Sequence, residues 1–439
     1  MVRRNGTAAG ESASGLARAV EAALGAADPA VARIVDRALA GHDVTVDEGA
    51  LLFEASGPSL HALTLAADYL RRETVGDIVT YVVNRNVNFT NVCIKRCGFC
   101  AFSRDHREEE GYFLPVEEIV RRAQEAWEMG ATEVCIQAGL PPKMRGSLYV
   151  DLCRAIKRAL PDIHIHGFSP EEVLYGAVRS RTTVREYLLA LKEAGVGSLP
   201  GTSAEILDDR VRRRISPGRI STAQWVEVIT TAHELGIRTS STIMYGHIET
   251  PAQRAAHIAL LRDIQRRTGG FTEFVPLSFV HTEAPMYMKG LVQGVRPGPT
   301  GTDVVKMYAV SRLMLNRDIP NLQVSWVKEG PRLAQLCLMA GANDFGGTLI
   351  NESISTSAGA QHGQLVRPAE FRRMIREAGR IPAERTTTYA IRRVFDDPAR
   401  DPDERLNHVE SPEERFGSYA RLTHDPRFRY RPELPVTAV

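Results

Sequence analysis

The chain has 439 residues, with 55 Lys and Arg against 53 Asp and Glu, and a formal net charge of +2. The two signs are interspersed, so no basic face for nucleic acid or for an anionic membrane is predicted. No stretch approaches about 18 uninterrupted apolar residues, and the Arg pair near the start is not followed by the apolar run of a signal peptide. A chain of this length suits two or three average domains or one large α/β barrel with extensions, and we expect it in the cytoplasm.

The first 75 residues divide into two parts. Residues 1–28 are rich in Ala, Gly and Ser and show little apolar periodicity, which predicts a mobile leader. In residues 29–75 the apolar positions recur with helical spacing, and Thr45 and Glu48 form a capping box. This part is therefore predicted to be a short helical N-terminal extension.

From residue 76 to 395, short strand-like runs alternate with amphipathic helical segments. The predicted strands are Ile78–Val83, Glu133–Gln137, Ile163–Phe168, Ser198–Thr202, Arg238–Tyr245, Phe274–Phe279, Leu322–Val327 and Asp344–Leu349. Helix starts are indicated at Pro115, Thr183, Ser221 and Thr250. Eight strands with a crossover after each predict an α/β fold of the (β/α)8 TIM-barrel type. An open doubly wound sheet is the alternative, but its Gly-x-Gly-x-x-Gly fingerprint is absent from the first strand–helix turn.

The composition changes after Phe395. Residues 396–439 are rich in Pro, Arg, Asp and Glu and contain few apolar anchors. This pattern predicts an irregular C-terminal tail that is extended or partly disordered.

Three of the six cysteines lie within eight residues, as Cys93-x3-Cys97-x2-Cys100. Thiolates at this spacing in a reducing compartment indicate a metal or cluster site rather than disulfides. Three ligands are one fewer than the usual four of an iron–sulfur cluster, so one iron would remain open. A zinc site completed by His106 is the alternative, although structural zinc usually braces modules with a smaller core than a barrel has.

The cysteine loop follows the first predicted strand, and polar or glycine residues follow most of the others. In barrel enzymes these positions meet at one face, which carries the active site. The segments concerned are Gln137–Gly139, Ser169–Glu171, Thr202–Glu205, Tyr245–Glu249, His281, Trp326–Lys328 and Gly346–Thr348.

The cysteine motif, with Phe99 just before its last cysteine, resembles the signature of the radical S-adenosylmethionine (SAM) superfamily. This resemblance implies that Cys93, Cys97 and Cys100 bind a 4Fe–4S cluster whose open iron binds SAM. It further implies that an external electron donor reduces the cluster. SAM is then cleaved to methionine and a 5′-deoxyadenosyl radical, which abstracts a hydrogen atom from the substrate.

The resemblance extends from about residue 76 to 390 and narrows to a group of deazaflavin and futalosine (menaquinone) biosynthetic enzymes. The stretches that carry it are Asn86–Arg104, Pro200–Leu207, Met244–His247, Gly270–Leu277, Ser325–Lys328, Gly347–Ser355 and Arg385–Tyr389. The last three are most similar to the second subunit or half of FO synthases, where FO is the deazaflavin chromophore precursor.

This similarity implies a transferase that cleaves the side chain of L-tyrosine. It would add the 4-hydroxybenzyl group to carbon 5 of 5-amino-6-(D-ribitylamino)uracil and release 2-iminoacetate. A second radical SAM protein, FO synthase subunit 1, would then close the ring. An aminofutalosine or dehypoxanthine-futalosine enzyme of menaquinone biosynthesis is the nearest alternative, and a non-catalytic zinc-binding scaffold barrel is the alternative of another class.

The resemblance also implies residue roles. Phe99 would flank the adenine of SAM, and Gln137 to Gly139 would replace the Gly-Gly-Glu element that usually binds its amino group. Further SAM contacts are expected from Glu205 and Met244. The substrate contacts are expected from Tyr245 and His247. No general base is expected, because hydrogen-atom abstraction requires none.

Overall fold

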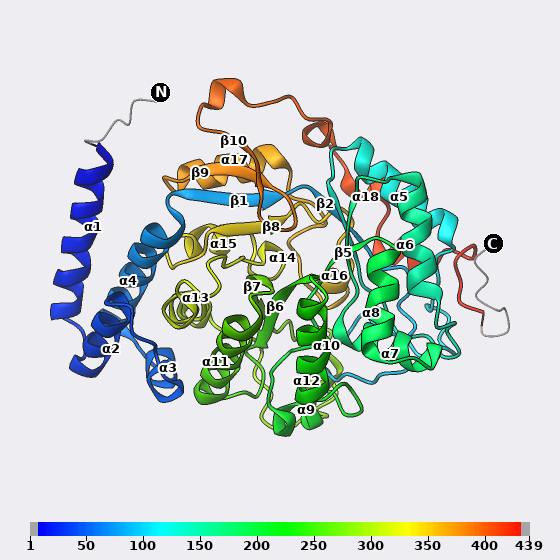
Figure 1. Ribbon diagram of the computed structural model, residues 1–439, viewed down its shortest axis with the longest axis horizontal. Coiled ribbons are helices and arrows are strands. Elements are labelled where there is room, and N and C mark those ends of the chain that lie inside the picture. Colours follow the sequence, from blue (N-terminus) through cyan, green and yellow to red (C-terminus); the bar gives the residue numbers. More distant parts are fainter. Residues whose placement is uncertain (1–7, 432–439) are drawn as a thin grey trace.

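The strands form two sheets around a common lumen in the computed structural model, which describes residues 8–431 (Figure 1). One sheet is parallel with the order β2-β3-β4-β5-β6-β7, and the other has the order β10-β9-β1-β8. The strands are β1 Ile78–Val82, β2 Asn84–Val87, β3 Glu133–Ile136, β4 His164–Gly167, β5 Val196–Leu199, β6 Arg238–Tyr245, β7 Phe271–Ser278, β8 Asp344–Gly347, β9 Ile381–Arg385 and β10 Ile391–Val394.

Consecutive strands and isolated bridges join the two sheets into a barrel. β1 leads into β2 across Val83, and Arg85 of β2 bridges to Ile350, just beyond β8. On the other side, Leu322 bridges to Phe274 of β7 and Gln323 bridges to Asp344 of β8. The predicted TIM-type α/β barrel is therefore confirmed.

The seventh predicted strand, Leu322–Val327, was too long. Only its first two residues make bridges, because the chain turns into α14 at Trp326, whose indole Nε1 donates to the Gly347 carbonyl at 2.8 Å. Strands β9 and β10 were not predicted. β9 adds in parallel to the edge of β1 opposite β8, and β10 returns antiparallel to it.

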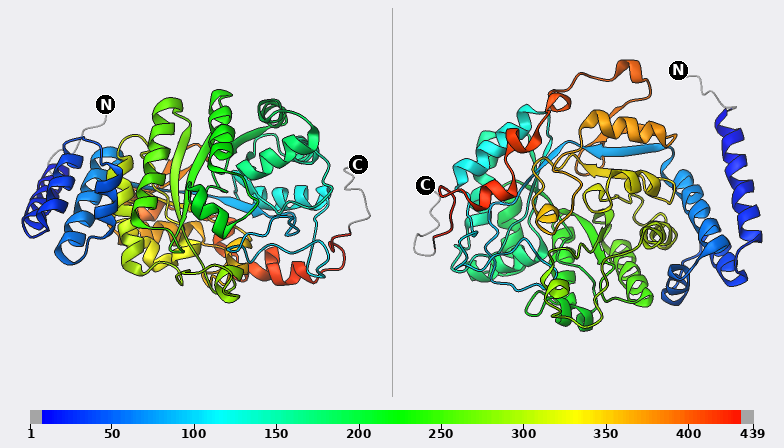
Figure 2. Two further views of the ribbon diagram at one scale, coloured as in Figure 1. Left: turned by 90° about the horizontal axis from the view of Figure 1, so that it is seen from below. Right: turned by 180° about the vertical axis from the view of Figure 1, so that it is seen from behind.

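Helices alternate with the strands and cover the outside of the barrel (Figures 1 and 2). The predicted caps at Thr45, Thr183, Ser221 and Thr250 all form capping boxes with the residue three positions later. The helices are α1 Ala8–Gly25, α2 Pro29–Leu39, α3 Val46–Phe53, α4 Gly57–Val75, α5 Val116–Glu128, α6 Leu148–Ala159, α7 Pro170–Ser180, α8 Val184–Glu193, α9 Asp209–Ile215, α10 Thr222–Glu234, α11 Pro251–Thr268, α12 Pro285–Met288, α13 Gly301–Leu315, α14 Trp326–Glu329, α15 Pro331–Cys337, α16 Ile354–Ser357, α17 Pro368–Glu377, α18 Pro412–Phe416 and α19 Tyr419–Thr423, with short 3₁₀ turns η1 Pro398–Arg400 and η2 Arg405–His408.

The two ends of the chain are more ordered than their composition predicts. Within the predicted mobile leader 1–28, residues 8–25 form α1, which packs beside α4 with Val20 and Leu24 buried. Residues 1–7 lie outside the described part. The predicted irregular tail carries η1, η2, α18 and α19, because Leu406, Phe416 and Leu422 find apolar partners and are buried. A few well-spaced apolar residues suffice to fix both segments.

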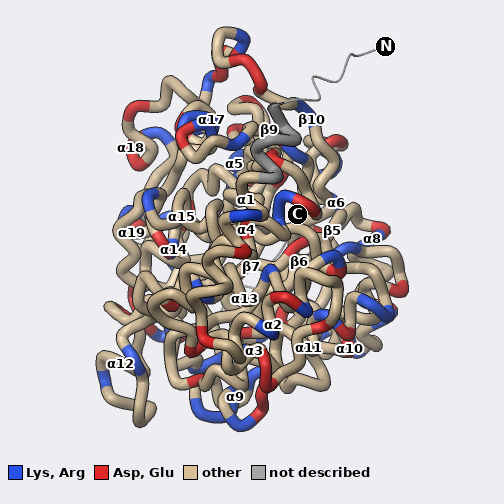
Figure 3. Tube along the Cα trace, turned by 90° about the vertical axis from the view of Figure 1, so that its left-hand side faces the viewer, with Lys and Arg blue, Asp and Glu red and all other residues tan. Residues whose placement is uncertain are grey.

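Residues of the two charge signs are mixed. Along the trace in Figure 3, Lys and Arg are interspersed with Asp and Glu, as expected from the sequence. Among the described residues, no helix combines the length and the apolar character that crossing a membrane requires.

Candidate active site

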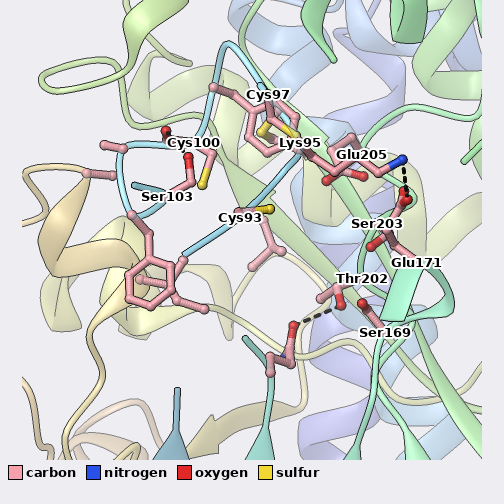
Figure 4. Close-up of a pocket in the computed structure, with 18 of the residues that line it drawn as sticks. Cys93, Lys95, Cys97, Cys100, Ser103, Ser169, Glu171, Thr202, Ser203 and Glu205 are labelled. Carbon is pink, nitrogen blue, oxygen red and sulfur yellow. Dashed lines mark hydrogen bonds and ion pairs between the residues drawn. The ribbon is translucent and has the colours of Figure 1, made fainter. Parts of the chain in front are cut away.

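A cavity of about 240 Å³ opens where the parallel strands end, and the cysteine loop forms one side of it (Figure 4). Cys93, Cys97 and Cys100 all line it. The opposite side consists of residues that follow β3, β4 and β5, together with residues of β6 and β7. These are Gln137, Gly139, Ser169, Glu171, Glu172, Thr202, Ser203, Glu205, Thr242, Met244, Leu277 and Ser278. The polar segments predicted after several strands thus meet at one face of the barrel.

Backbone hydrogen bonds hold the cysteine loop in place. The N–H of Cys93 donates to the Arg104 carbonyl at 3.0 Å, and the N–H of Ile94 donates to the Leu140 carbonyl at 2.8 Å. Gly98 donates to the Ile215 carbonyl at 2.8 Å and accepts from the Met286 N–H at 2.7 Å. The loop is therefore fixed by segments from three other parts of the barrel.

Two glycines permit these close approaches. A Cβ on Gly98 would lie 2.8 Å from Cβ of Met286, and a Cβ on Gly139 would lie 2.3 Å from the Val92 carbonyl oxygen. Real Cβ atoms do not approach backbone so closely. Gly139 is therefore required for the contact between the segment after β3 and the cysteine loop.

The three thiols fit an iron–sulfur cluster. Burial raises the pKa values of Cys93 and Cys97, and the neighbouring Cys100 raises both further while Arg219 lowers them. Binding to a metal replaces the proton of a thiol and offsets the cost of burying a thiolate. Each cysteine of a cluster binds a different iron, so the three sulfurs need not surround one point.

The geometry gives the zinc alternative no support. Within residues 8–431, no group of three or more His, Cys, Asp or Glu side chains is placed to hold a single metal ion. His106 does not line the cavity, and its Nδ1 lies 3.2 Å from Oδ1 of the adjacent Asp105.

Arg219 is the main charged residue beside the cysteines, and the sequence analysis did not identify it. Its Nη1 donates to Glu205 Oε1 at 2.7 Å, its Nε lies 3.3 Å from Glu171 Oε2, and its Nη2 donates to the Ser203 hydroxyl at 2.5 Å. Its guanidinium lies 5.8 Å from the ring centroid of Phe99. Arg219 therefore joins the cysteine loop to the segments that follow β4 and β5.

Most of the predicted SAM contacts do line this cavity. Phe99, Gln137, Gly139, Glu205 and Met244 are all part of its wall. Gln137 Oε1 accepts from the Thr202 hydroxyl at 2.9 Å, and Glu205 Oε2 is buried without a hydrogen-bond partner.

The two predicted substrate contacts lie away from the cavity. Tyr245 and His247 are fully buried, and they line neither this cavity nor the second cavity described below. The Tyr245 hydroxyl donates to Glu329 Oε1 at 3.4 Å, and His247 Nδ1 lies 3.1 Å from Glu249 Oε2. Tyr245 packs in the barrel wall because Thr242 and Met244 occupy the inward positions of β6. His247 lies beyond the end of this strand, where its ring contacts the Met244 carbonyl and Glu249.

A second cavity continues downward into the lumen, also with a volume of about 240 Å³. Gln137, Thr202, Thr242, Leu277, Lys328 and Ile354 line both cavities, so the two are adjacent. Alternate residues of the strands face this second cavity, as the period of a strand requires. They include Asn84, Asn86, Glu133, Cys135, His166, Ser240, Glu273 and Val275. Cys135 thus faces the lumen, whereas Cys153 and Cys337 are buried.

Lys328 occupies the junction of the two cavities. No hydrogen bond or ion pair is formed by its ammonium group within the described residues, and burial lowers its pKa. Glu352 and Glu329 lie close enough to raise that pKa in part. An ammonium group placed in this way is available to an anionic group of a bound molecule.

Comparison with protein families gives two matches that together cover most of the barrel. Residues 87–261 match the radical SAM superfamily, and residues 268–397 match the CofH/MqnC C-terminal region.

Individual relatives match over longer stretches. The 5-amino-6-(D-ribitylamino)uracil–L-tyrosine 4-hydroxyphenyl transferase of Methanothermobacter thermautotrophicus is 53% identical over 346 residues, covering 79% of this chain and 94% of that protein. The FO synthase of Mycobacterium leprae is 50% identical over 348 residues, covering 79% of this chain. The matched region spans only 40% of that longer FO synthase.

Solved structures agree on the fold. The [FeFe]-hydrogenase maturase HydG from Carboxydothermus hydrogenoformans superposes with a TM-score of 0.63 at 17% identity, over 86% of this chain and 85% of HydG. Methylornithine synthase (PylB) gives a TM-score of 0.58 at 19% identity, over 79% of this chain and 95% of PylB. At these identities the likeness concerns the fold alone.

Proposed function

Because the chain belongs to the radical SAM superfamily, and within it to the family of the 5-amino-6-(D-ribitylamino)uracil–L-tyrosine 4-hydroxyphenyl transferases, we propose that it transfers the 4-hydroxybenzyl group of L-tyrosine to 5-amino-6-(D-ribitylamino)uracil. The family confirms the resemblance seen in the cysteine motif and in the distant stretches around Gly201, Trp326 and Thr386. The observation that carries the proposal is a three-cysteine cavity that continues into a polar lumen. The reaction breaks the Cα–Cβ bond of tyrosine and forms a carbon–carbon bond at ring carbon 5 of the uracil.

Cys93, Cys97 and Cys100 would hold a 4Fe–4S cluster, and the cavity beside them would hold SAM. Once bound, the cluster and SAM supply a carbon radical that removes a hydrogen atom from tyrosine. Phe99, Gln137, Gly139 and Met244 line the same cavity and would form its contacts with SAM.

Glu205 is the acidic residue best placed for the amino group of SAM. Its Oε1 is paired with Arg219, while its buried Oε2 has no partner among the described residues. A free buried carboxylate oxygen is costly unless a donor reaches it, and the ammonium group of SAM is such a donor. Glu205 would thus take the role of the glutamate that is absent from the Gln137–Gly139 segment.

Lys328 would orient the amino acid substrate. It lies between the cavity of the cysteines and the lumen, where tyrosine must lie if its fragment is to reach a second substrate deeper in the barrel. An ion pair between the Lys328 ammonium and the tyrosine carboxylate would fix the amino acid end of the substrate. The surrounding wall keeps water away from a reactive radical.

The proposed pathway requires two further proteins. A reducing electron donor would supply the electron that starts each turnover, and a second radical SAM protein, FO synthase subunit 1, would close the deazaflavin ring.

The decisive experiment is an anaerobic assay of cluster-reconstituted protein with SAM, tyrosine and the diaminouracil. The expected product is the 4-hydroxybenzyl adduct of the diaminouracil, together with 5′-deoxyadenosine and methionine. Cleavage of SAM without this adduct, with consumption of a futalosine precursor instead, would favour the menaquinone-pathway alternative.

Metal and sulfide analysis separates the enzyme from a zinc scaffold. We expect about four irons per chain with matching sulfide, and loss of both in the Cys97→Ala variant. A colourless protein that contains one zinc and no sulfide after reconstitution would contradict the proposed enzyme activity.

A further inference from the structure

The second cavity, which we call the lower lumen, is polar and unfilled, in contrast to the usual interior of a TIM barrel. Barrel interiors are normally packed with layers of bulky apolar side chains. Here the inward positions near the start of the strands carry Asn84, Glu133, His166, Ser240 and Glu273, and a cavity of about 240 Å³ remains between them and the layers above. A polar cavity of this kind is suited to a polar ligand.

Asn86, Glu273 and Thr387, three of the residues that line this cavity, each have a buried side-chain oxygen without a hydrogen-bond partner in the described structure. Oε2 of Glu273 and Oδ1 of Asn86 are both buried and form no hydrogen bond. Glu273 itself is only 6% exposed. A buried polar atom without a partner costs about 1–3 kcal/mol, so several around one cavity point to a ligand that supplies the missing partners.

The neighbouring polar groups are held rigidly. Asn84 Nδ2 donates to Glu133 Oε1 at 2.8 Å, and its Oδ1 accepts from the Leu349 N–H at 2.9 Å. His166 Nδ1 lies 2.7 Å from the Ser198 hydroxyl. The site therefore presents fixed donors and acceptors rather than mobile side chains.

An ion pair contributes to the floor of the lumen. Arg385, at the end of β9, contacts both carboxylate oxygens of Asp344 at 2.5 and 2.9 Å, and both residues are buried. The cations among the residues that line this cavity are Arg385, which Asp344 neutralises, and Lys328 at the upper end. The floor therefore has no spare positive charge for a phosphate and suits a neutral ligand.

The pKa values of Glu133 and Glu273 are shifted in opposite directions. Burial raises the pKa of Glu273 to about 7, with only partial compensation by Arg385. Burial also raises the pKa of Glu133, but the electrostatic interaction with His166 and the hydrogen bond from Asn84 lower it by more, so the net shift is downward. Near neutral pH one carboxyl can therefore donate a hydrogen bond while the other accepts. Hydroxyl groups of a ligand can do both.

We propose that the lower lumen binds the polyhydroxylated ribityl chain of the diaminouracil, with Asn86 and Glu273 as its hydrogen-bond partners. This inference rests on the proposed function and assigns the orientation of its second substrate. With the chain in the lower lumen, the pyrimidine ring lies just below the junction marked by Lys328 and Gln137 and faces the cavity of the cysteines. Carbon 5 of the ring then faces the place where the hydroxybenzyl fragment arises.

The test compares the binding of two pyrimidines by anaerobic calorimetry, using cluster-reconstituted protein with SAM present. The probes are 5-amino-6-(D-ribitylamino)uracil and 5-amino-6-(methylamino)uracil, which lacks the hydroxylated chain. We expect Glu273→Leu to weaken binding of the ribityl compound at least tenfold and to leave binding of the methyl compound unchanged. Glu273→Gln keeps a donor of the same shape and should restore most of the affinity.

Tyr149→Phe is the matched control. Its hydroxyl is also buried without a partner, but Tyr149 lines neither cavity, so both pyrimidines should bind as in the unchanged protein. Equal losses for the two pyrimidines in Glu273→Leu, or no loss for the ribityl compound, would overturn the assignment. Absence of the hydroxybenzyl adduct in turnover of the unchanged protein would refute the proposed function instead, because the binding comparison does not depend on turnover.

Discussion

Arg219 and Glu205 form an ion pair beside the cysteine loop, with Nη1 of the arginine 2.7 Å from Oε1 of the glutamate. Both side chains are largely buried, and the arginine also reaches Glu171. Removing one member of a buried pair leaves an uncompensated charge. This pair therefore affects both the stability of the barrel and the charge that the cavity presents to SAM.

The Arg219→Met variant tests this dual role. Because Glu171 and Glu205 would both lose a partner, we expect the free energy of unfolding of the cluster-free protein to fall by about 3–5 kcal/mol. SAM binding to the reconstituted protein should also weaken. Urea denaturation and equilibrium binding of SAM measure the two effects.

Arg185→Met is the control for Arg219. Arg185 pairs with Glu234 at 2.8 Å, but both side chains are more than half exposed, so its loss should cost less than about 1 kcal/mol. If the two variants unfold alike, Arg219 does not organise the site.

Local sequence signals predicted much of the fold and part of the site. Capping boxes such as Thr183 with Glu186 depend on residues three apart, and the cysteine loop is one short segment. Arg219 could not be found in this way, because it lies between α9 and α10 and acts on residues from three other loops. The floor formed by Arg385 and Asp344 is equally non-local, since it depends on the unpredicted pairing of β9 with β1.

The position of Tyr245 in the barrel wall follows from strand periodicity. Side chains alternate between the two faces of a strand, so inward positions at Thr242 and Met244 place Tyr245 in the opposite direction. The tail was misjudged for another reason. Leu406, Phe416 and Leu422 are too few to give a periodic pattern, yet each is buried against the body of the barrel.

Gly139→Ala should impair the cysteine loop. The added Cβ would lie 2.3 Å from the Val92 carbonyl oxygen, so the two backbones must separate. We expect a loss of about 1–3 kcal/mol in the free energy of unfolding and incomplete iron loading. Iron and sulfide content after reconstitution measures the second effect. Gly301→Ala, where no atom lies within 4 Å of the new Cβ, should load fully, and equal loading of both variants would contradict the prediction.

The C-terminal segment stabilises the cysteine loop through Tyr419. Its hydroxyl accepts from Asn91 Nδ2 at 3.3 Å and donates to the Phe102 carbonyl at 3.1 Å, and its ring lies 5.4 Å from that of Phe102. In Tyr419→Ala we expect faster amide hydrogen exchange across residues 89–114, because local opening loses these contacts. Arg400→Ala removes an exposed ion pair with Asp397 and should leave that exchange unchanged. Unaltered protection in Tyr419→Ala would show that the segment merely lies against the loop.

Glu172 should make the stability of the cluster-free protein depend on pH. Burial raises its pKa to about 7, despite hydrogen bonds from Ser169 and Ala138 that favour the charged form. The folded protein therefore holds this proton up to about pH 7, whereas the unfolded chain releases it near pH 4.5. Between these values the folded state binds more protons, so the contribution of Glu172 to stability is present below pH 4.5 and declines as the pH rises to 7. In Glu172→Gln the capping position keeps a residue of the same shape that cannot ionise. As the pH rises from 4.5 to 7, the free energy of unfolding of this variant should therefore increase relative to that of the unchanged protein, by up to about 3 kcal/mol. Urea denaturation at several pH values measures the difference, and a difference that is constant with pH would show that Glu172 titrates normally.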